Sequence, residues 1–125
     1  MAKQDGIQQR QYFRLRYPES ARPMIRVQGK IFSVSETSEK GLRVKMGHVA
    51  SLYCGLKMKA VVSLHDDVDV IVEGSILRFD DNNEVVIKLV KGLSFKNMVS
   101  EQRYVRQRFS EAKVRNPRQN LSYAP

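Results

Sequence analysis

Between residues 24 and 90, apolar and polar side chains alternate in a series of short segments separated by polar turns. Because successive side chains of a strand point to opposite faces of a sheet, this alternation predicts β-strands with one buried face. The predicted strands cover residues 24–34, 41–46, 56–64, 68–79 and 84–90. The alternation slips at Gly29, which predicts a bend or bulge inside one long first strand. Strands of this length, joined by short turns, are typical of an antiparallel barrel or sandwich.

A helical pattern replaces the strand pattern after residue 94. Apolar side chains then recur at intervals of three and four, which predicts an amphipathic helix over about residues 95–110. Ser94 or Asn97 is expected to cap its first turn. The tail, residues 111–125, has two prolines and no periodicity, and we expect both this tail and the N-terminal segment 1–9 to be flexible.

The 125 residues, 42% of them hydrophobic, are enough for one compact domain. No apolar run is long enough to cross a membrane, and the N-terminus has no secretory signal, so we expect a cytoplasmic protein without membrane insertion. The lone Cys54 is expected to be buried and structural rather than nucleophilic, and two histidines provide no zinc-binding pattern. The chain also lacks paired catalytic groups, so we expect neither an enzyme nor a metal site.

The net charge of +9 favours anionic partners, and the charge is unevenly distributed. Residues 8–26 contain five arginines and a single acid, Glu19, whereas acids gather in 65–69 and 80–84. Within the basic segment, "RQYFR" places Arg10 and Arg14 four residues apart. Downstream, the turn "ETSEKG" contributes Glu36, Ser38 and Gly41.

This ordered pair of motifs resembles the two-part ligand motif of PilZ domains, bacterial receptors for cyclic di-GMP. The family has an Arg-x-x-x-Arg element before the first barrel strand and then an Asp/Asn-x-Ser-x-x-Gly turn. The resemblance implies a six-stranded antiparallel PilZ-type β-barrel with a C-terminal α-helix over residues 10–110. Its parts would be a ligand arm over 10–18, the barrel over about 22–92 and the helix over about 95–110.

The resemblance also implies the ligand-binding residues, which are Arg10, Arg14, Glu36, Ser38 and Gly41, with Gln9, Tyr12 and Arg16 as accessory contacts. The chemistry agrees, because the fork of an arginine matches the O6 and N7 acceptors of guanine and also pairs with phosphate. Glu36 departs from the family pattern by one methylene, since Asp or Asn is usual there. We expect Phe13 and Tyr17 to anchor the arm on the barrel. The second Arg-x-x-x-Arg pair, Arg22 and Arg26, lies too close to the turn and is interpreted as surface charge.

The function implied is a cyclic di-GMP receptor or adaptor, without any other cofactor, that changes conformation and signals to a protein effector controlling motility, biofilm or virulence. It would act as a monomer or homodimer. Two alternatives stay open. A basic barrel can bind RNA or single-stranded DNA through the arm and its aromatic residues. A PilZ adaptor that has lost its ligand is also compatible with Glu36.

Overall fold

The computed structural model describes residues 12–47 and 51–115, with side chains described up to residue 109. These residues form one seven-stranded sheet, two single-turn 3-10 helices and a C-terminal α-helix. The strands are β1 (Leu15–Arg16), β2 (Met24–Val27), β3 (Lys30–Thr37), β4 (Gly41–Lys45), β5 (Lys57–Leu64), β6 (Val68–Asp80) and β7 (Glu84–Lys91). The helices are η1 (Glu19–Ala21), η2 (His65–Asp67) and α2 (Phe95–Arg115).

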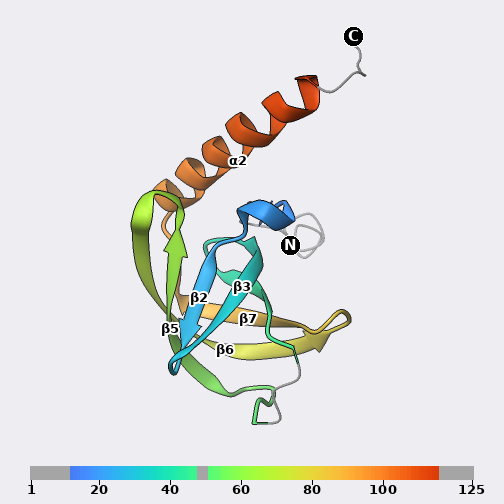
Figure 1. Cartoon of the computed structure of the whole chain (residues 1–125). Coiled ribbons are helices and arrows are strands. Elements are labelled where there is room, and N and C mark those ends of the chain that lie inside the picture. The colour runs from blue at the N-terminus through green and yellow to red at the C-terminus, as the bar shows by residue number, and fades with distance from the viewer. Residues whose placement is uncertain (1–11, 48–50, 116–125) are drawn as a thin grey trace, which may run out of the picture.

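Six of the strands close into a barrel (Figure 1). The antiparallel pairings run β3–β2–β5–β6–β7–β4, and a further β3–β4 pairing closes the ring. The seventh strand, β1, pairs only with the end of β3 and lies outside the ring. The predicted fold, a six-stranded antiparallel barrel followed by one helix, is therefore confirmed.

The core of the barrel is made by the inward side chains of the alternating strands. The largest fully buried apolar side chains are Ile25, Val34, Val44, Val62, Ile76 and Val85. They come from six different strands, so the interior is filled by side chains. A ligand that binds this barrel without unfolding it must therefore use the outside.

The prediction of one long strand over residues 24–34 with a bulge at Gly29 is wrong. The segment is a hairpin of β2 and β3, with Val27 opposite Lys30 and a two-residue turn between them. Both turn residues have positive φ angles, 49° at Gln28 and 81° at Gly29, as a type I′ hairpin turn requires. A two-residue turn interrupts the alternation as a bulge does, and the pattern alone does not separate the two.

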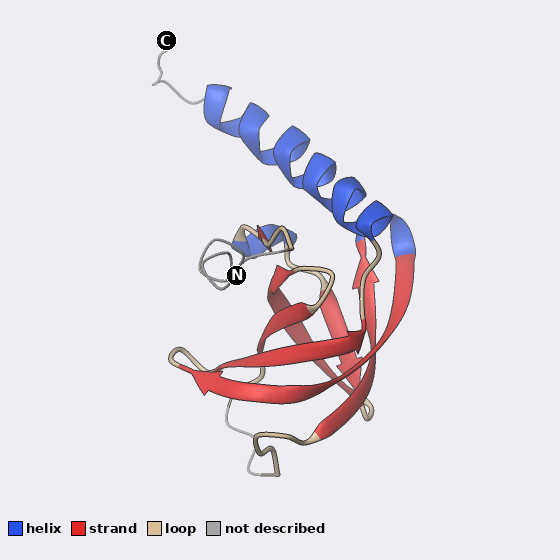
Figure 2. Cartoon of the chain, turned by 180° about the vertical axis from the view of Figure 1, so that it is seen from behind, coloured by secondary structure: helices blue, strands red, loops and turns tan. Residues whose placement is uncertain are grey.

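Helix α2 begins with the predicted cap. The Asn97 amide donates to Ser94 Oγ at 2.9 Å, and the Ser94 amide donates to Asn97 Oδ1 at 3.0 Å, so both candidate residues take part. Leu93 and Met98 are buried against the barrel, and the helix then projects away from it (Figure 2). The helix continues to Arg115, beyond the predicted end near residue 110. No helix in the described part of the chain is both long and apolar enough to cross a membrane.

The expectation of a buried Cys54 is wrong, because this thiol is free and exposed. Cys54 lies in a turn before β5, which the Leu56 amide closes by donating to the Tyr53 carbonyl at 3.0 Å. The acidic turn at the β5–β6 connection is exposed at Asp66 and Asp67, in agreement with its interpretation as a solvated turn.

Candidate ligand-binding site

The N-terminal arm is attached to the barrel through β1. Leu15 and Arg16 lie opposite Thr37 and Glu36 of β3, and the Tyr17 amide donates to the Ser35 carbonyl at 3.0 Å. Leu15 and Tyr17 are buried, which turns Arg14 and Arg16 outward. The predicted anchoring by Tyr17 is confirmed. Phe13 is not an anchor, because it lies before the paired residues and its side chain is 51% exposed.

The β3–β4 turn is held in place by backbone hydrogen bonds to itself and to the end of β7. The Ser38 amide donates to the Gly41 carbonyl at 2.9 Å, and Ser38 Oγ accepts from the Lys40 amide at 3.3 Å. The Leu89 amide donates to the Lys40 carbonyl at 2.9 Å. Gly92 lies so close that a Cβ there would be 2.1 Å from the Glu39 carbonyl oxygen. The turn is therefore a fixed part of the barrel surface.

Gly41 has a different role from the one its turn position suggests. It lies at the first position of β4 and its φ is outside the left-handed region. A Cβ at Gly41 would meet the Ile87 carbonyl oxygen at 3.4 Å and Ser38 Oγ at 3.6 Å. Its small size thus keeps the surface open between the turn and β7.

Glu36 belongs to a five-residue ionic cluster, which is formed by Glu36, Arg43, Arg78, Asp80 and Glu84. Arg43 Nε contacts Glu36 Oε1 at 3.3 Å, and Arg43 Nη1 contacts Asp80 Oδ2 at 2.5 Å and Glu84 Oε1 at 3.3 Å. Partial burial lowers the pKa of Arg43, but its bonds to Asp80 and the nearby carboxylates outweigh this effect and raise that pKa above its ordinary value. Hydrogen bonds from Arg78 and Arg43 hold the pKa of Asp80 below its usual range.

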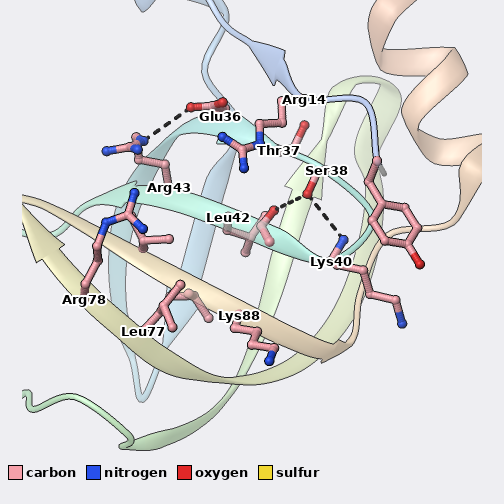
Figure 3. A pocket seen from close by; sticks show the side chains of 14 residues that line it. Arg14, Glu36, Thr37, Ser38, Lys40, Leu42, Arg43, Leu77, Arg78 and Lys88 are labelled. Carbon is pink, nitrogen blue, oxygen red and sulfur yellow. Dashed lines mark hydrogen bonds and ion pairs between the residues drawn. The ribbon is translucent and has the colours of Figure 1, made fainter. Parts of the chain in front are cut away.

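A cavity of about 200 Å³ lies beside this cluster, between the arm and the outer surface of β4, β6 and β7. Its lining includes four of the five predicted ligand residues, which are Arg14, Glu36, Ser38 and Gly41. Tyr12 also lines it, whereas Arg16 does not. Arg10 and Gln9 lie outside the described residues. Figure 3 shows Arg14 between the Glu36–Arg43 ion pair and the turn with Ser38 and Lys40.

Several lining residues were not among the predicted ones: Thr37, Lys40, Leu42, Arg43, Leu77, Arg78, Val86, Ile87 and Lys88. With Arg14, the basic members are Arg43, Arg78, Lys40 and Lys88, against one lining carboxylate, Glu36. Arg43 and Arg78 are bound to acids, while neither Lys40 nor Lys88 forms an ion pair with another described residue. The cavity is therefore suited to an anion. The sequence contains a signal for Arg43, which is on the outward face of a half-buried strand, but the pairing that brings Arg78 and Lys88 beside it is not readable from spacing.

A buried polar network connects the wall of this cavity to helix α2. Thr37 Oγ1 donates to the Tyr17 hydroxyl at 3.3 Å, and that hydroxyl donates to Glu101 Oε1 at 2.7 Å. Glu101 is only 1% exposed, and its Oε2 accepts from the His65 amide at 3.2 Å and contacts His65 Nδ1. Burial, reinforced by the Glu101 carboxylate, raises the pKa of Tyr17 well above its ordinary value. The arm, the barrel and the helix thus meet at one carboxylate.

The cavity is lined by cationic, aromatic and apolar side chains. In the described ranges, no group of three or more His, Cys, Asp or Glu side chains is placed to hold a metal ion. Exposed aromatic and arginine side chains of the arm face a basic strand surface, an arrangement that can stack on a base and pair with phosphate.

No protein-family model matches the chain, and no curated protein sequence matches it. Solved structures are similar in fold. The structure of the Bacillus subtilis inhibitor of motility (MotI/DgrA) has a TM-score of 0.59 at 15% identity, covering 82% of this chain and 51% of that chain. The PilZ domain of YcgR from Escherichia coli, solved with c-di-GMP, has a TM-score of 0.57 at 15% identity, covering 83% and 94%. This chain thus spans about half of the first structure and nearly all of the second.

Proposed function

The chain folds as a PilZ-type domain, and from this fold and its basic surface cavity we propose that it is a receptor for cyclic di-GMP. The observation that carries the proposal is the meeting of Arg14 with Glu36, Ser38 and Gly41 around one cavity. All four belong to the two short motifs that resemble the PilZ ligand motif. The similar PilZ domain of YcgR was solved with the same ligand.

In the proposed complex, the arm supplies arginines and the barrel supplies a fixed surface. Arg14 stacks on or pairs with a guanine, whose O6 and N7 match the guanidinium fork, and Arg10 does the same from the preceding part of the arm. Lys40 and Lys88 are placed to attract the two phosphates. Tyr12, at the rim, is an accessory stacking residue, as are Gln9 and Arg16 for polar contacts.

Glu36 is proposed to accept hydrogen bonds from guanine N–H groups. Its Oε1 is held by Arg43, whereas Oε2 forms no hydrogen bond or ion pair with another described residue. Arg43 therefore fixes the direction of the longer glutamate side chain and leaves one oxygen for the ligand. Ser38 is bound to its own turn and acts mainly by keeping that turn in shape.

Isothermal titration with cyclic di-GMP tests the proposal. Arg14→Ala removes one forked contact and should weaken binding by about 1–3 kcal/mol, or roughly 5- to 150-fold. Arg26→Ala is the matched control, because Arg26 is an exposed arginine of β2 that does not line the cavity. Its affinity should equal that of the wild type. Absence of heat at high micromolar ligand would refute the receptor function.

The two alternatives give different results in the same series. A protein that binds RNA or single-stranded DNA should bind generic oligonucleotides with a strong salt dependence that cyclic di-GMP does not change. A ligand-free adaptor should give no heat in the wild type but measurable binding in Glu36→Asp. The ion pair that occupies Glu36 is the observation that favours this second alternative.

We further propose that the loaded receptor signals to a protein effector in motility, biofilm formation or virulence, in the cytoplasm and without catalysis of its own. The arm is the part of the proposed site that can change position, because it is paired to the barrel over only two residues. A ligand held between Arg14 and the barrel would fix the part of the arm that precedes β1 and so present a new surface.

A further inference from the structure

The exposed surface of helix α2 is strongly basic. Lys96, Arg103, Arg106 and Arg108 are all exposed. The one acid among residues 95–109, Glu101, points inward and is 1% exposed. No exposed carboxylate of this stretch therefore offsets the four cations. Such a face attracts a negatively charged partner at long range.

A groove of about 680 Å³ follows this face, between α2 and the η2 turn. Its lining includes three cations of the helix, Lys96, Arg103 and Arg108, and from the turn His65 and one exposed carboxylate, Asp66. Phe95 and Val99, four residues apart and hence on one side of the helix, add an apolar strip. Phe95 is 69% exposed. An exposed aromatic side chain beside cations is typical of the anchor position of a protein interface.

The aromatic residues of the groove favour a protein partner over a nucleic acid. The Tyr104 ring is stacked on His65, with centroids 4.4 Å apart and planes 7° apart, and the Arg108 guanidinium lies 5.5 Å from the Tyr104 centroid. This ring is therefore already in use and offers little room for a base. The cations at 96 and 103 are about 10 Å apart along the helix axis, at 1.5 Å per residue. In an acidic helix lying alongside, carboxylates seven residues apart have the same axial separation as these two cations.

We propose that this groove binds an acidic helical segment of a partner protein. Carboxylates of the segment pair with Lys96, Arg103 and Arg108, and one apolar side chain packs on Phe95 and Val99. This docking does not depend on the ligand site. Its regulation does rest on the proposed function, because the groove wall at His65 is bonded to Glu101, which also binds Tyr17 of the arm.

The test uses a fluorescein-labelled helical peptide with glutamates at seven-residue spacing and one central leucine, followed by fluorescence anisotropy. The wild type should bind it, and Lys96→Glu combined with Arg103→Glu should weaken binding at least tenfold. Lys57→Glu combined with Lys59→Glu is the control, since these exposed lysines lie on β5 and outside the groove, and it should lose less than threefold. Phe95→Ser should weaken binding without a change of charge. Melting curves of all variants verify that they are folded.

Three results would overturn the docking proposal: no binding of the peptide to the wild type at low salt, equal losses in the groove and control variants, or tighter binding of a labelled single-stranded oligonucleotide that the groove variants abolish. The regulation is tested by adding cyclic di-GMP, which should change the peptide affinity in the wild type and not in Tyr17→Phe. Peptide binding without any cyclic di-GMP heat in titration would refute the receptor function and leave the docking intact. Heat on titration with cyclic di-GMP, without peptide binding, would refute the docking proposal and leave the receptor function intact.

Discussion

Removal of one hydroxyl group, in Tyr17→Phe, should destabilise the whole domain. The hydroxyl donates to Glu101 at 2.7 Å, and both side chains are buried, at 3% and 1% exposure. A hydrogen bond to a charged group contributes about 1.5–3 kcal/mol, and Thr37 loses its acceptor as well. We therefore expect a loss of about 2–3 kcal/mol, and a melting temperature lower by roughly 8–12 °C for a domain of this size.

Urea denaturation, monitored by circular dichroism, measures this loss. If the slope of the unfolding free energy against urea concentration is unchanged, only the stability has changed. Tyr53→Phe is the matched control, because that ring is 60% exposed and the variant should stay within about 0.5 kcal/mol of the wild type. A double-mutant cycle with Glu101→Gln should give a coupling energy of about 1–2 kcal/mol, as expected for directly bonded side chains. A Tyr17→Phe variant as stable as the Tyr53→Phe control would contradict the network described above.

Three further predictions concern the pKa values of Tyr17 and Asp80 and the packing of the β3–β4 turn. The pKa of Tyr17 is raised in the folded state. The contribution of Tyr17 to stability is therefore present below the ordinary tyrosine pKa of about 10 and is lost as the pH rises above it. In urea titrations, the free energy of unfolding should fall less at alkaline pH in Tyr17→Phe than in the wild type. The pKa of Asp80 is lowered in the folded state, so its contribution to stability is present above the ordinary pKa of 3.8 and is lost as the pH falls. The melting temperature of Asp80→Asn should therefore depend less on pH in the acid range than that of the wild type. An identical dependence in both proteins would argue against the ionic cluster around Arg43. Gly92→Ala places a Cβ 2.1 Å from the Glu39 carbonyl oxygen and should both destabilise the domain and weaken cyclic di-GMP binding, whereas Gly41→Ala, with its nearest contact at 3.4 Å, should cost less stability.

The strands and helix α2 were predictable because their signals are local. Alternation placed β4 to β7 within a residue or two, and the Ser94–Asn97 cap fixed the start of α2. The hairpin at Gly29 was not separated from a bulge, because both interrupt the alternation at one glycine. The prediction for Phe13 was wrong because this side chain lies before the first paired residue of β1 and has nothing to cover it.

The candidate site was predictable only where it is encoded by spacing along the chain. Arg14, Glu36, Ser38 and Gly41 lie in two short motifs, and the structure brings them to one cavity. The basic residues of β6 and β7 come beside them through cross-strand register, such as Gly41 opposite Lys88, which no short motif contains. Glu101 did leave a signal in the sequence, because it is three residues after Met98 and four before Val105 on the apolar stripe. A charged residue on such a stripe indicates a buried partner.

The closed ring of six strands separates what keeps this protein folded from what it recognises. Its interior is full of aliphatic side chains, and every residue of the candidate cavity that carries charge stands on the outside. A change at Glu36 therefore alters the charge of the candidate cavity with little effect on the core. A domain built in this way can gain, alter or lose a ligand over evolution while its architecture stays the same, and this accounts for a shared fold at 15% sequence identity.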